Sequence, residues 1–482
     1  FEYVRRDGKN ASLTEKATLT PEEAALEKRY REIADSLTAL GSERSTLLEK
    51  KEGTVAEEQR LAKLDQDLQE AEKVFQKFLG QLSIELRAMK GAENSVVQIN
   101  GSEAFKDDLR ELGKGTVALY TVVAENRFHV ILTTPEVRRS YTYAIKAADL
   151  NRKVLDFRAA LQNPKVDPLP LAQELYKIIV APLAKDLKAA KAETLMWSLD
   201  GVLRYMPVAA LHDGEKYLVE RFRNVVFTSA SKARLKDEPH RQWTALGLGV
   251  TKAHGDRIPA LPAVADEMRG IIREEGSSTG VLPGTIRLDE QFTLEAMQTS
   301  LRRRPPVVHV ASHFRFEPGN ETDSALLLGD GNFLSLAQIK TMTNVFSGVE
   351  LLTLSACNTA TGSSGANGKE IEGFGMMAQN KGAKAVVASL WPVADRSTKE
   401  LMRAFYQLRE AKAGTSKAEA LQQAQGQLLN GKLAAAPQDL TQREIVHETG
   451  NANHLPPFKV DPKKPYAHPY YWAPFILIGN WK

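Results

Sequence analysis

The sequence of 482 residues predicts an α/β protein, with a mainly parallel, doubly wound sheet sandwiched by helices and preceded by an N-terminal helical hairpin. Two observations support this fold class. From about residue 244 to the C-terminus, short apolar runs alternate with amphipathic helical patterns, which is typical of strand–helix–strand units. In the first hundred residues, apolar side chains recur every three or four positions along polar segments, which is typical of long exposed helices.

The N-terminal segment, residues 1–100, is predicted to be a helical coiled-coil hairpin. Thr20-Pro21-Glu22-Glu23 is a helix start, because Thr caps the first turn and Pro is favoured at the first helical position. Gly53-Thr54 interrupts the apolar spacing, which resumes from Leu61 to Leu82. We expect two antiparallel helices that serve as a connector or an interaction arm. The end of a helical repeat array is the alternative.

Residues 101–240 are predicted to form a separate α/β region. Its expected elements are strands at Thr116–Ala124, Arg127–Thr134 and Arg138–Ile145, helices at Ala148–Leu161 and Leu169–Leu187, and a hairpin from Leu195–Leu199 to Val202–Met206. Glu125-Asn126 and Asp200-Gly201 are the turn signals within this region.

Residues 241–482 carry the strand–helix alternation. The expected strands are Thr244–Val250, Val307–Ala311, Leu326–Leu328, Glu350–Ser355, Ala385–Leu390 and Phe475–Ile478. The expected helices are Ala260–Glu275, Thr293–Arg304, Glu370–Asn380 and Ser397–Glu410, with Thr293 as an N-cap. This alternation predicts a doubly wound sheet.

Two of these strands end at reactive side chains. Cys357, the single cysteine, follows one apolar run, and His313 follows another. A lone cysteine is usually a small buried hydrophobe, and a lone histidine is usually structural. Open α/β sheets, however, bind ligands at the carboxyl ends of their strands, so the pair indicates a Cys-His dyad. His309 is expected on the same face but deeper, where a structural role is favoured.

Five motifs support a family resemblance. They are Val308-His309-Val310-Ala311-Ser312-His313, Leu354-Ser355-Ala356-Cys357-Asn358-Thr359, Lys381-Gly382-Ala383-Lys384-Ala385-Val386-Val387, Ser389-Leu390-Trp391-Pro392-Val393-Ala394-Asp395 and His468-Pro469-Tyr470-Tyr471-Trp472-Ala473-Pro474-Phe475. In this order they resemble the CHAT proteases, bacterial members of the caspase–separase clan that are often fused to tetratricopeptide repeats. The resemblance covers roughly residues 105–482 and is strongest from 305 to 482.

The resemblance implies a cysteine endopeptidase with a caspase-like fold. Cys357 would be the nucleophile and His313 the acid–base partner, and the backbone N–H groups of Phe314 and Cys357 would stabilise the oxyanion. The family usually has Gly where this chain has Phe314. Residues 101–240 resemble the degenerate α/β half that often precedes the active one in this clan. Asp395 resembles an acidic residue of the primary specificity pocket in separase, whereas its local reading is a cap of the following helix.

Activation by a protein partner or an upstream sensor region is implied by the same resemblance. The loop Thr359–Lys369 is rich in Gly and Ser and lacks the Gly-Lys-Ser/Thr pattern of a phosphate-binding loop, so a segment that orders around substrate is favoured. Two alternatives to an enzyme stay open. One is a catalytically silent CHAT-fold adaptor, and the other is a helical-arm scaffold in which Cys357 is structural.

Composition excludes several other classes. A net charge of +4 with no dense basic stripe gives no case for nucleic-acid binding, and no apolar run is long enough for a membrane span. A single cysteine excludes internal disulfides and Cys-rich metal sites, which fits a reducing cytoplasm. No cofactor is expected. Since the chain starts at Phe1 rather than Met, we expect a preceding segment in the full-length protein.

Overall fold

The computed structural model describes residues 54–88, 106–135, 138–232, 234–255, 258–316, 324–355, 358–359, 369–391, 395–433 and 455–482, together with isolated helical positions between 28 and 47. The chain divides into two compact units. The first comprises Phe1–Ala144 with Pro182–Ala192, and the second comprises Ile145–Ala181 with Glu193–Lys482. The predicted helix start at Thr20 lies outside the described residues.

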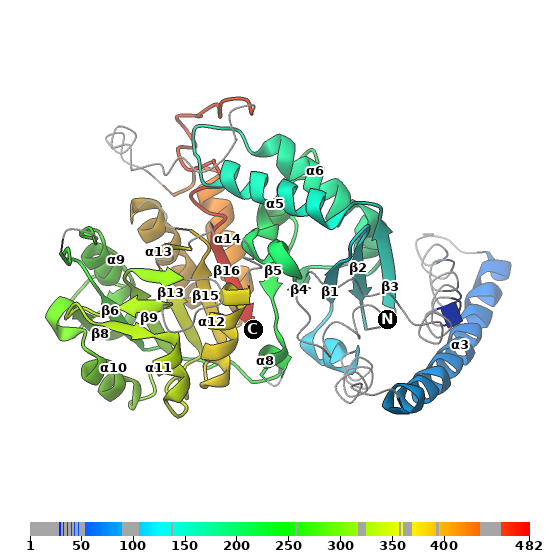
Figure 1. Ribbon diagram of the computed structural model, residues 1–482, viewed down its shortest axis with the longest axis horizontal. Coiled ribbons are helices and arrows are strands. Elements are labelled where there is room, and N and C mark those ends of the chain that lie inside the picture. Colours follow the sequence, from blue (N-terminus) through cyan, green and yellow to red (C-terminus); the bar gives the residue numbers. More distant parts are fainter. Residues whose placement is uncertain are drawn as a thin grey trace. The chain divides into compact units, whose positions relative to one another are not determined.

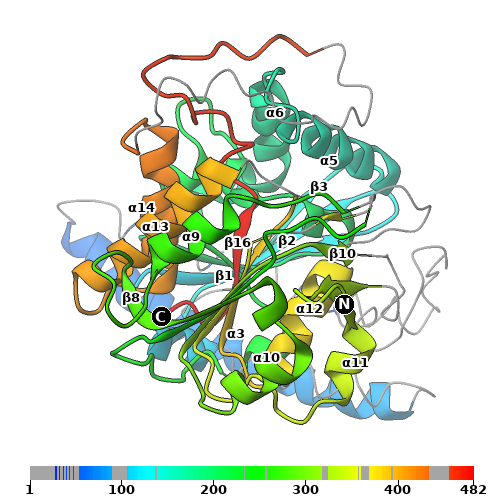
Figure 2. The ribbon, with the colours of Figure 1, turned by 90° about the vertical axis from the view of Figure 1, so that its left-hand side faces the viewer.

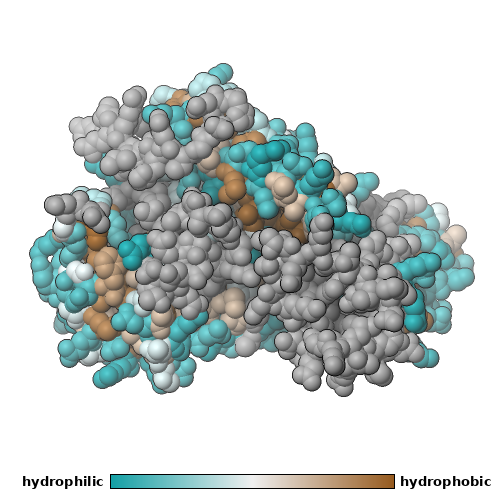
Figure 3. All heavy atoms as spheres, viewed as in Figure 1, coloured by the Kyte–Doolittle hydropathy of each residue, from teal (hydrophilic) through white to brown (hydrophobic). Residues whose placement is uncertain are grey.

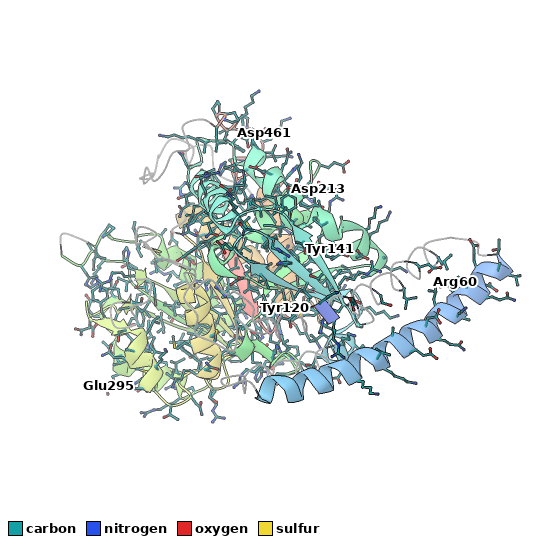
Figure 4. All side chains as sticks on the ribbon, turned by 45° about the vertical axis from the view of Figure 1, so that its right-hand side comes forward. Arg60, Tyr120, Tyr141, Asp213, Glu295 and Asp461 are labelled. Carbon is teal, nitrogen blue, oxygen red and sulfur yellow. The ribbon has the colours of Figure 1, made fainter. Side chains whose placement is uncertain are left out.

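The first unit contains α3 (Val55–Ala88), a helical turn at residues 106–112, the strands β1 (Thr116–Val123), β2 (Phe128–Thr133) and β3 (Arg138–Tyr143), and α7 (Ala184–Ala189). Helix α3 begins directly after the predicted interruption at Gly53-Thr54, because Thr54 and Glu57 form a reciprocal cap at its first turn. Arg60 of this helix forms two hydrogen bonds, of 2.6 and 2.7 Å, to the carboxylate of Glu43, a helical residue of the preceding segment. Figure 4 shows Arg60 on this long helix.

Strands β1 to β3 form an antiparallel meander in the first unit. Val123 pairs with Phe128, so the predicted turn at Glu125-Asn126 is confirmed. All eight residues of β1 are buried, whereas Arg139 is the one buried residue of β3. Arg139 and Tyr141 of β3 both contact Asp186 of α7. Tyr141 is labelled in Figure 4.

The second unit contains the remaining elements. Its strands are β4 (Thr194–Ser198), β5 (Arg223–Val226), β6 (Ala245–Gly249), β7 (Ile272–Arg273), β8 (Leu282–Leu288), β9 (Val307–Ala311), β10 (Phe314–Phe316), β11 (Ala325–Leu327), β12 (Phe333–Ser335), β13 (Leu351–Leu354), β14 (Asn358–Thr359), β15 (Ala385–Ser389) and β16 (Phe475–Gly479). Its α-helices are α5 (Ala147–Leu161), α6 (Leu169–Ile179), α8 (Ser229–Lys232), α9 (Val264–Ile271), α10 (Leu294–Leu301), α11 (Leu336–Thr341), α12 (Lys369–Asn380), α13 (Asp395–Ala411) and α14 (Lys417–Leu429).

The main sheet of the second unit has the strand order β4-β5-β16-β15-β13-β9-β6-β8-β7. Its pairs are parallel except for β15 with β16, which are antiparallel. Strands β9, β13 and β15 are buried along their whole length, as expected of parallel strands covered on both faces. The predicted mainly parallel α/β fold is therefore confirmed.

Helices cover both faces of this sheet. In Figures 1 and 2, α9, α13 and α14 lie on one face, while α10, α11 and α12 lie on the other. Helix α9 packs closely on β6 because two residues of that strand are glycines. A Cβ atom at Gly247 would come within 2.9 Å of the Met268 sulfur, and one at Gly249 within 2.7 Å of Val264. The glycine spacing of this strand therefore sets how close α9 lies to the sheet.

Exposed apolar side chains are scattered on the described surface, which is mostly hydrophilic in the face shown by Figure 3. The large ones are Val55, Val74, Tyr143, Leu155, Phe333 and Val460. None of the helices in the part of the chain that the structure describes combines the length and the apolar character needed to cross a membrane.

Three element predictions were wrong. Val202–Met206 is not a strand, because Gly201 adopts a positive φ of 58° and starts a 3₁₀ turn at Gly201–Tyr205. The helix expected at Leu169–Leu187 ends at Ile179 and continues, after a 3₁₀ turn that contains Pro182, as α7. The helix expected at Ala260–Glu275 spans only α9, because the chain enters β7 directly after Ile271.

Candidate active site

Strands β9 and β13 are parallel neighbours, so their carboxyl ends meet at one edge of the sheet. His313 follows β9 by two residues, and the segment that contains Cys357 follows β13. Strand β6 has β8 on one side and β9 on the other. After β6 the chain forms β7 and β8 on one side, and then crosses to form β9 on the opposite side. The crossovers therefore run in opposite directions from β6, and such a switch point is where open α/β sheets bind ligands.

A small second sheet, ordered β12-β11-β10-β14, forms at this edge. Strand β10 directly follows His313, and β14 directly follows Cys357. These two strands pair in parallel, with Arg315 opposite Asn358. On the other side of the site, the backbone N–H of Ser355 donates to the carbonyl of Val310 at 2.8 Å. Cys357 itself lies outside the described residues, but the chain is paired with the His313 segment both before and after it.

His313 is half-buried and has a defined partner. Its Nε2 atom lies 2.9 Å from the carbonyl oxygen of Pro259, in the loop that follows β6. A carbonyl oxygen only accepts hydrogen bonds, so Nε2 carries the proton. The contact crosses the switch point between β6 and β9. In the neutral imidazole, Nδ1 is then the nitrogen with the free lone pair.

Strand β11 holds the backbone around His313. The hydroxyl of Ser312 donates to the carbonyl of Leu327 at 2.7 Å, and the N–H of Leu327 donates to the carbonyl of His313 at 2.9 Å. Ser312 is nearly completely buried. No sequence motif indicated this clamp, because the acceptor of the Ser312 hydroxyl is a backbone carbonyl 15 positions away.

The orientation of the Phe314 N–H follows from the same contact. In a trans peptide, the carbonyl of one residue and the N–H of the next point in opposite directions. The His313 carbonyl points to β11, so the Phe314 N–H points to the other side, on which β14 lies. The Phe314 side chain is buried, with 1% of its surface exposed.

His309 lies in β9 with no exposed surface. Its Nε2 atom is 2.9 Å from a carboxylate oxygen of Glu267 on α9, and its Nδ1 atom is 3.1 Å from the hydroxyl of Tyr406 on α13. The Tyr406 hydroxyl is also 2.9 Å from the hydroxyl of Thr353 on β13. The predicted burial of His309 is confirmed, and its two hydrogen-bond partners come from two helices, α9 and α13.

Asp395 is the first residue of α13, and its side chain is not among those described. The strand predicted at Ala385–Leu390 ends at Ser389, so Asp395 belongs to the helix and not to the strand. Its position at a helix start is compatible with the capping reading and leaves the pocket role a prediction. Most of the loop expected to order around substrate, residues 360–368, lies outside the described residues.

Arg158 of α5 holds the backbone at the end of β15. This buried guanidinium donates to the carbonyl of Leu390 at 2.8 Å and to that of Tyr205 at 2.9 Å. Its charge lies 5.3 Å from the ring centre of Tyr205 and 5.9 Å from that of Trp391. Arg158 therefore ties α5 to the segment that leads from β15 towards Asp395. No local sequence signal separates it from Arg152, the other arginine of this helix.

The C-terminal motif contains a second buried histidine. His468 donates through Nε2 to the carbonyl of Val166 at 2.9 Å and accepts through Nδ1 from the N–H of Tyr470 at 3.0 Å. Burial lowers the pKa of His468 to about 4, against a smaller opposing effect of the Val166 hydrogen bond. The ring is thus neutral near pH 7 and serves as a structural link within the second unit.

Within the described ranges, no three His, Cys, Asp or Glu side chains are grouped as metal ligands.

The CHAT domain family matches residues 169–480. No curated protein matches the sequence. Two solved structures of the Saccharomyces cerevisiae separase–securin complex are similar to the chain, each with 10% sequence identity. One has a TM-score of 0.46 and covers 94% of this chain and 36% of that chain. The other has a TM-score of 0.41 and covers 77% and 33%, respectively.

The chain thus spans about a third of the length of the separase chains that it matches. The family match, in contrast, extends over more than half of this chain and includes both strands that precede His313 and Cys357. The resemblance that the five motifs indicated is confirmed by this match, and the protein belongs to the CHAT domain family.

Proposed function

We propose that the protein is a cysteine endopeptidase in which Cys357 attacks the substrate carbonyl and His313 transfers protons. One observation carries the proposal: the backbone that flanks Cys357 pairs with the backbone that flanks His313 on both sides of the site. Nucleophile and base must lie within hydrogen-bond reach of each other, and this double pairing restricts the distance between the two segments. Membership of the CHAT domain family supports the same reaction class.

The hydrogen bond of His313 supports a defined acid–base role. With its Nε2 proton donated to Pro259, the ring has Nδ1 available to take the thiol proton of Cys357. The sulfur then bonds to the carbonyl carbon of the scissile peptide. The proton on Nδ1 passes to the leaving amine as the C–N bond breaks, and water hydrolyses the acyl-enzyme. In this proposal the backbone carbonyl of Pro259 orients His313, a role that a carboxylate has in catalytic triads.

The charge that develops on the carbonyl oxygen needs nearby hydrogen-bond donors. The N–H of Phe314 points to the side of β10 on which β14 and the Cys357 segment lie, which supports its role as one donor. We assign the second donor to the N–H of Cys357. Because only the backbone of Phe314 is involved, its bulky side chain is compatible with the role where the family usually has Gly.

Substrate selection and activation belong to the same proposal. We assign Asp395, at the start of α13, to the pocket for the residue before the cleaved bond, where its carboxylate would favour Arg or Lys. We also expect the isolated chain to have little activity until a protein partner or an upstream region orders the loop around residues 359–369. Turnover of unrelated proteins by the isolated chain would contradict this expectation.

The test uses the single thiol of the chain. Iodoacetamide alkylates the thiolate, so the rate of Cys357 modification, followed by mass spectrometry, reports its ionisation. We expect His313→Ala to slow alkylation at pH 7 by about tenfold or more, but not at pH 10, where the thiol ionises without help. A peptidyl ketone should label the native chain, slowly in the absence of the activating partner, but should not label Cys357→Ala. Identical pH–rate profiles for native protein and His313→Ala would refute the dyad and favour the silent adaptor.

A further inference from the structure

We infer that the buried polar chain formed by Glu267, His309, Tyr406 and Thr353 positions the catalytic pair; this inference rests on the proposed function. These four hydrogen-bonded side chains, the polar chain, join four elements: α9, β9, α13 and β13. All its hydrogen bonds lie between 2.9 and 3.1 Å, and none of its residues is more than 4% exposed.

The register of β9 and β13 relates the polar chain to the two proposed catalytic residues. His309 and Thr353 are directly paired in the β9–β13 ladder. His309 lies four residues before His313, and Thr353 lies four residues before Cys357. The hydroxyl of Tyr406 therefore bridges the two strands at equal distances along the chain from the two catalytic residues. A shift of one strand along the other would break this bridge.

The same chain also anchors the partner of His313. Glu267 belongs to α9, and the loop that leads into α9 carries Pro259, whose carbonyl accepts the hydrogen bond from His313. The strand of His313 is thus tied to α9 through His309, and its ring is tied to the loop before α9. These two contacts fix both the backbone and the ring of His313 relative to one segment.

The donors and acceptors of the chain are consistent along its whole length. Glu267 accepts from Nε2 of His309, so Nδ1 of His309 accepts from the Tyr406 hydroxyl, which accepts in turn from Thr353. Burial raises the pKa of Tyr406, so the phenol keeps its proton and donates it. Each hydroxyl of the polar chain therefore donates its hydrogen bond to one defined acceptor.

A buried polar chain is a poor way to stabilise a core, because apolar side chains of similar shape often do as well. Its advantage is a defined geometry, since each member has few alternative partners in a dry interior. Catalytic groups need such definition, because a displacement of about 1 Å can cost on the order of 10²-fold in rate. A positioning role therefore depends on the hydrogen bonds of the polar chain, whereas a purely stabilising role would need only the buried volume of its side chains.

The experiment replaces one hydroxyl by a methyl group of the same shape, Thr353→Val, in the intact chain. Its matched control is Thr228→Val, because Thr228 is also buried in the second unit and bonds to Ser231 and Gln379, far from β9 and β13 in the sheet order. Tyr406→Phe is the second test variant, and Thr353→Ser restores the hydroxyl. The readouts are the rate of Cys357 alkylation at pH 7 and the free energy of unfolding.

We expect Thr353→Val and Tyr406→Phe to slow alkylation by roughly tenfold, towards the rate of His313→Ala. Thr228→Val should lower the free energy of unfolding but keep the native alkylation rate within about twofold. Thr353→Ser should also keep the native alkylation rate within about twofold. If His313→Ala slows alkylation but Thr353→Val and Tyr406→Phe do not, the positioning role is refuted while the dyad stands. Equal slowing by Thr228→Val would also refute it. If His313→Ala has no effect, the proposed function itself fails.

Discussion

Replacement of the buried His468 by Gln should remove part of the acid sensitivity of the fold. The ring is 1% exposed, and burial lowers its pKa from 6.5 to about 4. As the pH falls below about 6.5, the unfolded chain takes up a proton at this position, while the folded chain does so only near pH 4. The unfolded state is therefore favoured increasingly through this interval.

The magnitude follows from the difference between the two pKa values. Between pH 7 and pH 5, His468 should contribute a loss of about 2 kcal/mol to the free energy of unfolding. His468→Gln has no ring to protonate, and its amide still supplies a donor for the carbonyl of Val166. It leaves the N–H of Tyr470 without its acceptor, so the variant should be less stable at pH 7 by about 1–3 kcal/mol.

The assay is urea unfolding at pH 7 and pH 5, because the change between the two pH values is independent of the hydrogen bond that the variant loses. The native chain should lose about 2 kcal/mol more than His468→Gln over this interval. His240→Gln makes the same replacement at an exposed side chain and should keep the native acid sensitivity. Equal losses for the native chain and His468→Gln would refute the reasoning.

Three further predictions concern other charged groups. Arg158→Met should lower the free energy of unfolding by on the order of 2–4 kcal/mol in urea titrations, because two buried carbonyls lose their donor. Glu350→Gln should cost about 3–5 kcal/mol by the same assay, because the buried ammonium of Lys417 loses its counterion. Burial opposes the ionisation of Glu350, but Lys417 and Lys384 outweigh it and lower its pKa, so the native stabilisation should be lost as the pH falls below about 4.5. Asp395→Asn should selectively reduce the cleavage of Arg-containing peptides if Asp395 lines the pocket. If the cleavage preference in a peptide library is unchanged and the free energy of unfolding falls by about 1 kcal/mol or less, Asp395 has only a capping role.

The sequence predicted best those elements whose side chains are buried on both faces. Val307–Ala311 and Ala385–Ser389 each have four apolar residues out of five, and both are strands of the parallel core. Leu282–Leu288 has the interrupted pattern Leu-Pro-Gly-Thr, so its position beside β6 was not predicted. Helix α14 was also missed, although Ser416 caps it and Glu419 stands three residues later, a pattern that indicates a helix start.

The candidate site was predictable where it depended on local pattern, and not where it depended on tertiary contacts. His313 stands out because a polar residue stops an apolar strand. Its partner Pro259 has no side-chain donor or acceptor and lies 54 positions away, so no residue type indicates the contact. Tyr406 lies on the buried stripe of a regular helix, where an aromatic residue is ordinarily read as core. Only the packing of α13 against β9 and β13 makes its hydroxyl a bridge.

The C-terminal motif holds the end of β15 although it lies far from that strand in the sequence. Its strand β16 pairs antiparallel with β15 and parallel with β5, and so joins the first part of the second unit to the strand beside β13. The carbonyl of Tyr470 accepts from the indole of Trp391, directly after β15. Arg158 approaches the same point through Leu390. The end of β15 is therefore held from two directions, and because β15 is the neighbour of β13, the motif supports the strand that leads to Cys357 without contributing a reactive group.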